Sequence, residues 1–260
     1  MSRDRIWLDA LRRFAKGFLR GSRSAAARSE ASREYPPDFT ASDVETIQAV
    51  RPFTMTSAEK IYELLRSVEY IVRAGIPGDV VECGVWKGGS MMAVAFELRR
   101  LQATSRRLHL FDTFEGMTPP QKVDRSFRGE QASDLLDAAD PETSWVWARG
   151  VLEQVRDALG RTEYPSELIT YVKGKVEDTL PRAAPEQIAL LRLDTDWYES
   201  TYHELRHLYP RLAPGGVLII DDYGHWEGAR RAVDQYLREE GIPLFLHRID
   251  YSGRVAIKPR

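Results

Sequence analysis

The sequence predicts an α/β fold built on a doubly wound, mostly parallel sheet with helices on both faces. Three observations favour this fold class. Short apolar runs alternate along the chain with longer segments of helical periodicity. The first run leads through a glycine-rich turn into a helix and then into a second run, which is the order of a βαβ unit. The length of 260 residues suits one large domain of this kind.

The first half of the domain supplies that βαβ unit. Its leading helix can be capped by Thr56 or Ser57, and its apolar residues recur every three or four positions. The two runs that follow are short and apolar, as buried parallel strands are. The expected elements are a helix over 56–74, strands over 79–83 and 108–112, and between the strands a turn over 84–90 and a helix over 91–101.

The second half continues the alternation after a polar stretch over 113–142. Two short apolar runs near the C-terminus indicate an antiparallel pair that closes the sheet. The expected elements are helices over 144–159, 200–212 and 228–240, strands over 168–172, 188–194 and 216–221, and closing strands over 244–249 and 254–257.

Residues 1–50 form an arm ahead of a domain that spans 51–260, with an inserted lid expected over about 117–160. Apolar and basic residues over 5–20 predict a basic amphipathic helix, and a Ser-, Ala- and Arg-rich flexible stretch follows over 21–38. Such a helix binds a membrane surface or a partner, or it packs on the domain, on another subunit or over an active site. The packing interpretation is favoured, and a homo-oligomer is therefore expected.

Composition excludes several classes of protein. The formal net charge is −2, so no basic field indicates nucleic-acid binding. A single cysteine, Cys83, rules out an internal disulfide and a cysteine-built zinc site. No apolar run reaches the roughly 18 residues of a membrane span, and the N-terminus lacks the apolar region of a secretory signal. We expect a cytoplasmic protein without stable membrane insertion.

Acidic residues stand at the ends of four expected strands, where an open parallel sheet binds its ligands. They are Glu82, Asp112, Asp194 with Asp196, and Asp221 with Asp222. Crowded carboxylates repel one another, and a bound cation relieves that repulsion. Carboxylate oxygens without a soft ligand nearby suit a hard divalent cation such as Mg²⁺. We expect Asp194, Asp221 and Asp222 to bind it, which leaves Asp196 as a general base.

The turn Glu82-Cys-Gly-Val-Trp-Lys-Gly-Gly-Ser90 is similar to a nucleotide-binding loop, but it is neither G-x-G-x-x-G nor a P-loop. Lys87 precedes two glycines, which argues against a triphosphate ligand. Glu82 suits a ligand with a positive group, and Gly84 permits close approach of the backbone. Asp112 ends the next strand and is placed to hold ribose hydroxyls.

Together, four motifs resemble the macrocin O-methyltransferase family of antibiotic and natural-product biosynthesis. They are Val81-Glu-Cys-Gly-Val-Trp-Lys-Gly-Gly-Ser90, Leu110-Phe-Asp-Thr-Phe-Glu-Gly-Met117, Leu193-Asp-Thr-Asp-Trp-Tyr-Glu-Ser-Thr201 and Pro214-Gly-Gly-Val-Leu-Ile-Ile-Asp-Asp-Tyr223. The resemblance covers roughly residues 51–237. It implies a Rossmann-like methyltransferase fold, S-adenosylmethionine and Mg²⁺ as cofactors, and methyl transfer to a hydroxyl of a sugar or phenol moiety of a natural product.

The resemblance also implies roles for single residues. Glu82 and Gly84 would flank the methionine end of the cofactor, Asp112 would hold its ribose, and residues 174–178 would line the adenine pocket. The implied cofactor-binding set is Glu82, Gly84, Ser90, Asp112, Gly174, Val176, Glu177 and Asp194. The resemblance places Asp194, Asp221 and Asp222 at the Mg²⁺ site and Asp196 at the position of the family's base.

Three other functions stay open at this point. Asp194-Thr-Asp196 is a D-x-D after an apolar strand, as in metal-dependent glycosyltransferases that use nucleotide sugars. His203-Glu-Leu-Arg-His207 matches the zinc-protease pattern H-E-x-x-H, although no third ligand is evident. A non-catalytic module that binds S-adenosylmethionine and a partner is the third. The acid at the first turn and the second aspartate pair favour the methyltransferase.

Overall fold

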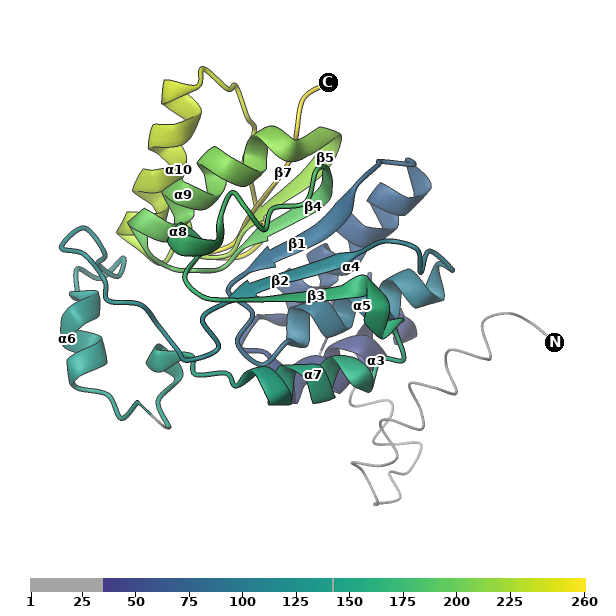
Figure 1. The fold of residues 1–260 in the computed structure, drawn as a ribbon, viewed down its shortest axis with the longest axis horizontal. Coiled ribbons are helices and arrows are strands. Elements are labelled where there is room, and N and C mark those ends of the chain that lie inside the picture. The colour runs from purple at the N-terminus through teal and green to yellow at the C-terminus, as the bar shows by residue number, and fades with distance from the viewer. Residues whose placement is uncertain (1–34, 142) are drawn as a thin grey trace.

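The computed structural model describes residues 35–141 and 143–260 (Figure 1). Seven strands form one sheet in the order β3-β2-β1-β4-β5-β7-β6. Strands β1 to β5 are parallel, and β7 runs antiparallel to β5. The predicted doubly wound sheet with an antiparallel closing strand is therefore confirmed. The chain builds outward from β1 and then returns beside it as β4, which makes this pair the topological switch point.

Most elements lie within two or three residues of their predicted positions. The strands are β1 (Asp79–Cys83), β2 (Leu108–Asp112), β3 (Ile169–Lys173), β4 (Ile188–Leu193), β5 (Leu212–Ile220), β6 (His247–Arg248) and β7 (Arg254–Ile257). The α-helices are α3 (Ala41–Val50), α4 (Ala58–Arg73), α5 (Gly89–Arg100), α6 (Ala132–Asp137), α7 (Leu152–Gly160), α8 (Val176–Thr179), α9 (Tyr198–Leu208) and α10 (Glu227–Glu239).

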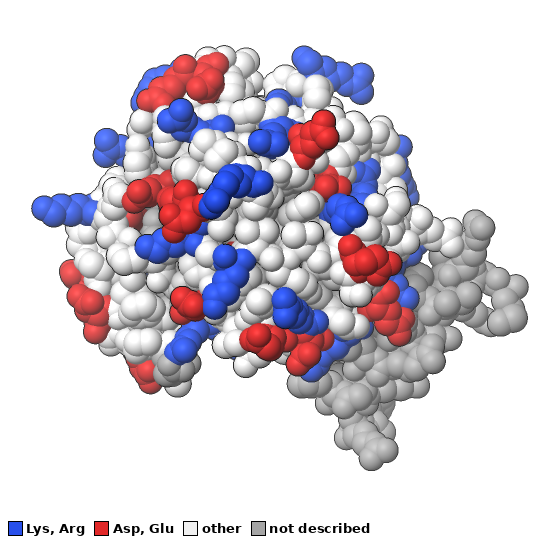
Figure 2. All heavy atoms as spheres, viewed as in Figure 1, with Lys and Arg blue, Asp and Glu red and all other residues white. Residues whose placement is uncertain are grey.

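Helices cover both faces of the sheet (Figure 1). Helices α3, α4, α5 and α7 pack over one face, and α8, α9 and α10 pack over the other. The helix α6 lies apart from both layers, in a small apolar cluster with Trp197 and Trp226. Lys, Arg, Asp and Glu are interspersed over the face drawn in Figure 2, without a patch of one sign. No helix in residues 35–141 or 143–260 is long and apolar enough to cross a membrane.

Three stretches differ from expectation. The predicted helix over 144–159 was wrong in its first half, where a 3-10 turn (Trp145–Trp147) precedes α7. Ala148 has a positive φ, and Gly150 packs directly on the Trp86 carbonyl, so a continuous helix cannot form there. The predicted strand over 244–249 shrinks to the two residues of β6. Helix α9 ends at Leu208 because Pro210 lacks the N–H that a longer helix needs.

The predicted arm falls largely on residues that the structure does not describe. The amphipathic helix over 5–20 and most of the stretch over 21–38 lie outside the described residues, so their roles and the homo-oligomer stay predictions. Within the segment assigned to the arm, α3 is a helix that sequence analysis missed. Thr40 caps it, and Ile47 and Val50 are buried against α4 and α5. The predicted lid stretch contains α6 and α7, of which α7 packs on α5 in the main helical layer.

Candidate active site

A cavity of 350 Å³ lies at the carboxyl ends of the parallel strands. This volume is within the range of small-molecule sites, and the position is the one that a doubly wound sheet offers. Every predicted site residue except Glu82 lines it. Those lining residues are Gly84, Ser90, Asp112, Gly174, Val176, Glu177, Asp194, Asp196, Asp221 and Asp222.

Asp112 shapes the turn between β1 and α5. Its Oδ2 accepts hydrogen bonds from the backbone N–H groups of Val85 (2.6 Å) and Trp86 (3.0 Å), and its Oδ1 accepts one from Phe114 (2.6 Å). Burial raises the pKa of Asp112, and the three N–H donors offset part of that rise. Asp112 therefore holds the turn in place, in addition to the ribose role that sequence analysis expects of it.

Position 84 has no room for a side chain, because the backbone of Asp194 lies directly beside it. A Cβ atom at this position would lie 2.0 Å from the backbone carbonyl oxygen of Asp194, and the φ of Gly84 is +82°. Sequence analysis attributed this glycine to close approach of a ligand. Gly84 does line the cavity, but the close approach that excludes a side chain is that of the β4 backbone.

The segment after β3 and the start of α9 together form another wall of the cavity. Ser200 on α9 donates a hydrogen bond to Glu177 Oε1 at 2.6 Å. The second oxygen of Glu177 is buried and has no partner among the described residues. This wall thus presents one free carboxylate oxygen, which is able to accept from an N–H donor of a ligand.

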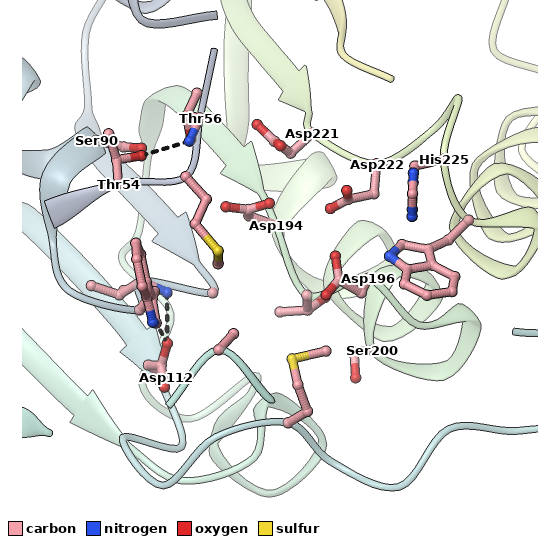
Figure 3. A pocket seen from close by; sticks show the side chains of 18 of the residues that line it. Thr54, Thr56, Ser90, Asp112, Asp194, Asp196, Ser200, Asp221, Asp222 and His225 are labelled. Carbon is pink, nitrogen blue, oxygen red and sulfur yellow. Dashed lines mark hydrogen bonds between the residues drawn. The ribbon is translucent and has the colours of Figure 1, made fainter. Parts of the chain in front are cut away.

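Three carboxylates converge at the ends of β4 and β5 (Figure 3). Asp194, Asp221 and Asp222 each offer one oxygen, and these three oxygens lie within 4.8 Å of one another. In addition, Asp222 Oδ2 is buried without a hydrogen-bond partner. An all-oxygen donor set with an unsatisfied carboxylate oxygen fits a hard divalent cation such as Mg²⁺.

Two basic residues neutralise part of this cluster. Lys60 Nζ on α4 lies 2.5 Å from Asp221 Oδ2, and Arg192 Nη2 on β4 lies 2.5 Å from Asp221 Oδ1. Burial alone would raise the pKa of Asp221, but these two cations hold it at about 2. For Lys60, burial lowers the pKa, and Asp221 and Asp222 outweigh that effect and raise it above its usual range. The cluster and Asp196 together supply four carboxyl groups, whereas Lys60 and Arg192 supply two positive charges. The acidic groups therefore outnumber the cations by two, which a bound dication would offset.

Asp196 lies beside the cluster of Asp194, Asp221 and Asp222, here called the metal-type cluster, and points toward Asp222 (Figure 3). Its φ is 68°, a left-handed conformation that aspartate tolerates better than most residues. Desolvation and the neighbouring carboxylates Asp194 and Asp221 raise the pKa of Asp196 to about 7, although a side-chain hydrogen bond with Asp222 opposes the rise. Burial and Asp196 likewise raise the pKa of Asp222. One of these two acids is therefore well placed to exchange a proton near neutral pH.

The comparisons with known proteins identify the family. The model of the macrocin-O-methyltransferase (TylF) family matches residues 12–257. The chain belongs to this family. It is 38% identical over 204 residues to the 8-demethyl-8-(2,3-dimethoxy-alpha-L-rhamnosyl)-tetracenomycin-C 4'-O-methyltransferase of Streptomyces olivaceus, covering 77% of this chain and 73% of the relative. It is 31% identical to the mycinamicin III 3''-O-methyltransferase of Micromonospora griseorubida, covering 95% and 94%.

A solved structure agrees with this assignment. The O-methyltransferase NovP superposes with a TM-score of 0.69 at 31% identity, covering 80% of this chain and 83% of NovP. The protein is thus an S-adenosylmethionine-dependent O-methyltransferase. The glycosyltransferase interpretation of Asp194-Thr-Asp196 and the non-catalytic module are set aside by this membership.

The H-E-x-x-H segment of the methyltransferase lies on α9, as expected. The rings of His203 and His207 meet edge-on with centroids 4.4 Å apart. In the described parts of the chain, the one group of three or more metal-type side chains is the aspartate cluster, and neither histidine belongs to it. The pattern therefore gives no zinc site.

The stretch predicted as a lid lines one side of the methyltransferase cavity. Met117, Thr118 and Val146 line the cavity from this segment. Asp124, which is fully buried, accepts hydrogen bonds from the Tyr198 N–H at the start of α9 (2.8 Å) and from the Gln121 N–H (2.6 Å). The lid is thereby attached to the helix that begins two residues after Asp196.

Aromatic residues complete that side of the cavity. Trp197 donates its indole N–H to the Thr118 carbonyl at 2.8 Å and packs edge-on against Trp226. His225 lines the cavity near Asp222, and its Nδ1 lies 3.0 Å from the hydroxyl of Tyr251. Trp226 and His225 thus give this side of the cavity an aromatic wall with a polar edge, and Trp197 packs behind Trp226.

Sequence analysis missed Lys60 and Arg192. Lys60 lies on the polar side of an amphipathic helix, where its pattern is that of any surface lysine. Arg192 did carry a signal, because it is a lone charged residue inside the apolar run Ile188-Ala-Leu-Leu-Arg-Leu193. A parallel strand covered on both faces has no place for an unpaired arginine, so its presence predicts buried acidic partners.

Proposed function

We propose that this methyltransferase transfers the methyl group of S-adenosylmethionine to a hydroxyl of a sugar or phenol moiety of a natural product, with Mg²⁺ as second cofactor and Asp196 as general base. The observation that carries the proposal is the aspartate cluster. Asp194, Asp221 and Asp222 converge within 4.8 Å in the cavity that also contains the glycine-rich turn. A plain cofactor-binding pocket has no use for three convergent carboxylates.

The relatives support the acceptor class. Their names specify a dimethoxyrhamnosyl tetracenomycin, mycinamicin III and, for a third relative from Streptomyces niveus at 32% identity, demethyldecarbamoylnovobiocin. In this chain, Met117, Val146 and Trp226 form an apolar wall next to the aspartates. Such a wall suits a bulky acceptor whose reacting hydroxyl faces the carboxylates.

The cofactor would occupy the half of the cavity built by β1, β2 and β3. Gly84 and Ser90 would lie along its methionine end, and Asp112 would accept from its ribose hydroxyls. Gly174, Val176 and Glu177 would line the adenine pocket, where the unpartnered Glu177 oxygen can accept from an amino group. Asp194 would face both the cofactor and the metal.

The chain's residues then account for the reaction. When bound, Mg²⁺ would supply a Lewis acid that lowers the pKa of an acceptor hydroxyl. Asp196 would remove the hydroxyl proton at its carboxylate, and its pKa of about 7 suits that transfer near neutral pH. The lid and the glycine-rich turn would align acceptor and methyl donor and exclude water.

The test is a titration followed by an assay. The EDTA-treated protein is titrated with S-adenosylhomocysteine by calorimetry, and methyl transfer to a panel of glycosylated macrolides and phenols is then measured with and without Mg²⁺. Cofactor binding together with Mg²⁺-dependent transfer is expected. Transfer that is equally fast in EDTA would overturn the metal, and transfer to neither acceptor class would overturn the acceptor assignment.

A further inference from the structure

Arg192 joins the two central strands to the metal-type cluster. Its side chain is 3% exposed, and its Nη1 lies 2.7 Å from Glu82 Oε1 and 2.7 Å from Asp194 Oδ2. Its Nη2 lies 2.5 Å from Asp221 Oδ1. One planar guanidinium thus bridges carboxylates from β1, β4 and β5. This is a geometry that the fixed fork of an arginine provides and a lysine does not.

Glu82 reaches the site only through this arginine. It is directly opposite Arg192 in the register of β1 and β4, it is 1% exposed, and it does not line the cavity. Its Oε1 pairs with Arg192, and its Oε2 has no hydrogen-bond partner among the described residues. A carboxylate in this position cannot contact a ligand in the cavity without a rearrangement of the strand.

We propose that Glu82 is a positioning residue that acts through Arg192 to orient and electrostatically tune Asp194 and Asp221 for the divalent cation, and that it does not bind S-adenosylmethionine. This inference rests on the Mg²⁺ site of the proposed function. It replaces the cofactor role that sequence analysis gave to Glu82.

Glu82 acts on the two aspartates in two ways, through the charge of Arg192 and through the direction in which Arg192 holds their oxygens. Without Glu82, the full positive charge of Arg192 would face the two aspartates that hold the dication. That charge would compete with the metal for their oxygens. With Glu82 in place, its carboxylate offsets the positive charge of the Arg192 guanidinium. The guanidinium fixes Oδ2 of Asp194 and Oδ1 of Asp221, so that the direction of the other oxygen of each carboxylate is set, although Asp221 Oδ2 also pairs with Lys60. Partners of metal ligands typically change metal affinity by about 10–100-fold when they are removed.

The experiment compares metal and cofactor affinity in matched variants of the full chain. Glu82→Gln keeps the shape and removes the charge. Glu97→Gln is the control, because Glu97 is also a buried glutamate paired with an arginine, Arg100, but it lies outside the cavity. Mn²⁺ binding is followed by the free-ion electron paramagnetic resonance signal, and S-adenosylhomocysteine binding by calorimetry.

We expect Glu82→Gln to weaken Mn²⁺ binding about 10–100-fold and to leave S-adenosylhomocysteine affinity within about twofold. Glu97→Gln should change neither. Unchanged Mn²⁺ affinity in Glu82→Gln would overturn the inference, as would a loss of cofactor affinity alone. A wild-type chain that binds the cofactor but no Mn²⁺ would overturn the metal site of the proposed function, and this inference with it.

A second variant covers the case in which Glu82→Gln does not fold. Arg192→Lys keeps the charge but loses the two separate guanidinium nitrogens, so it cannot hold the three carboxylates in the same geometry. It should weaken Mn²⁺ binding by a similar factor with the cofactor affinity retained. Wild-type Mn²⁺ affinity in Arg192→Lys would overturn the inference.

Discussion

Gly84 and Asp194 are in backbone contact across the switch point of the sheet. A Cβ atom on Gly84 would lie 2.0 Å from the Asp194 carbonyl oxygen, and the Asp194 N–H donates to the Cys83 carbonyl at 2.8 Å. The glycine-rich turn and the first metal-type carboxylate are therefore parts of one rigid unit. Neither can shift without displacing the other.

Gly84→Ala tests this coupling. A positive φ costs roughly 1–2 kcal/mol for alanine, and overpacking against backbone adds about 1–3 kcal/mol. We expect urea unfolding to show a loss of stability, and calorimetry to show that cofactor and metal affinity both fall. Gly75→Ala is the matched control, since Gly75 also has a positive φ (+61°) but has nothing within 4 Å of its Cβ position. Equal costs for the two variants would contradict the close approach.

Asp196→Asn tests the base. Asparagine keeps the size of the side chain and tolerates the left-handed backbone, so the loop should retain its shape. Because the variant cannot accept the hydroxyl proton, kcat should fall by about 10²–10⁴, while the affinity for S-adenosylhomocysteine should change little. Steady-state kinetics and calorimetry measure the two quantities. A loss of cofactor affinity would show that Asp196 acts in cofactor binding instead.

Asp221 and Asp222 should respond differently to the same substitution. Asp221→Asn removes the partner of Lys60 and Arg192, and breaking a buried pair costs about 3–5 kcal/mol. Asp222→Asn removes a carboxylate with an unpartnered oxygen, so it should cost little stability. Both should weaken Mn²⁺ binding by at least about tenfold. Thermal melting and metal titration separate the two effects, and equal melting temperatures for the variants would contradict the ion-pair assignment.

Stability and metal binding should depend on pH around neutrality. Burial raises the pKa of Asp196 to about 7, and a group whose pKa is raised on folding favours the folded state at low pH. The unfolded carboxyl loses its proton near its ordinary pKa of 3.8 and the folded one near 7, so that contribution declines between these two pH values and levels off above about 7. Its amplitude is modest because the side chain is partly exposed to solvent. In EDTA, the melting temperature should therefore fall over this window.

Added Mg²⁺ should reverse that fall. Cation binding requires ionised carboxylates and displaces their protons, so the apparent Mg²⁺ affinity should rise with pH through about 7. Calorimetry in buffers of different ionisation enthalpy counts the protons released. In Asp196→Asn, both the fall in melting temperature and the proton release should shrink. Identical profiles for the variant and the wild type would assign the titration to another group, of which Glu82 is the first candidate because burial raises its pKa to about 7 as well.

Asp124→Ala tests the attachment of the lid. Loss of the hydrogen bond to the Tyr198 N–H removes a capping interaction from α9, which is worth about 0.5–2 kcal/mol. We expect KM for the acceptor to rise, with the affinities for S-adenosylhomocysteine and Mn²⁺ retained. Ser133→Ala, an exposed change on the same segment, should leave KM unchanged. An equal effect of both variants would show that Asp124 does not hold the lid.

The sequence was sufficient for the sheet and for most of the cavity. The buried strands are short apolar runs, and their acidic ends converge because parallel strands end at one edge of the sheet. The same logic placed Asp194, Asp221 and Asp222 together. It could not show that Asp112 would be largely engaged by backbone N–H groups, because those bonds depend on the shape of the turn after β1.

Long-range pairing explains what could not be predicted. Lys60 reaches Asp221 across 161 positions of the chain, and Glu82 reaches Arg192 across 110. No local pattern records such partners, so the position of Glu82 at a strand tip alone predicts a cofactor ligand and gives no sign of Arg192. The predicted helix over 144–159 was wrong for a similar reason, since the tight contact of Gly150 with Trp86 is invisible in helical periodicity.

The backbone at Asp196 also limits how this enzyme can change. With a φ of 68°, the position favours glycine, asparagine, aspartate and histidine over other residues. Lysine or glutamate there would cost roughly 1–2 kcal/mol of backbone strain in the segment that also carries Asp194. Adaptation to acceptors of different acidity is therefore easier through cavity-lining residues such as His225 than through the proposed base. The backbone conformation at position 196 narrows the choice of residue there, while the cavity wall is free to vary.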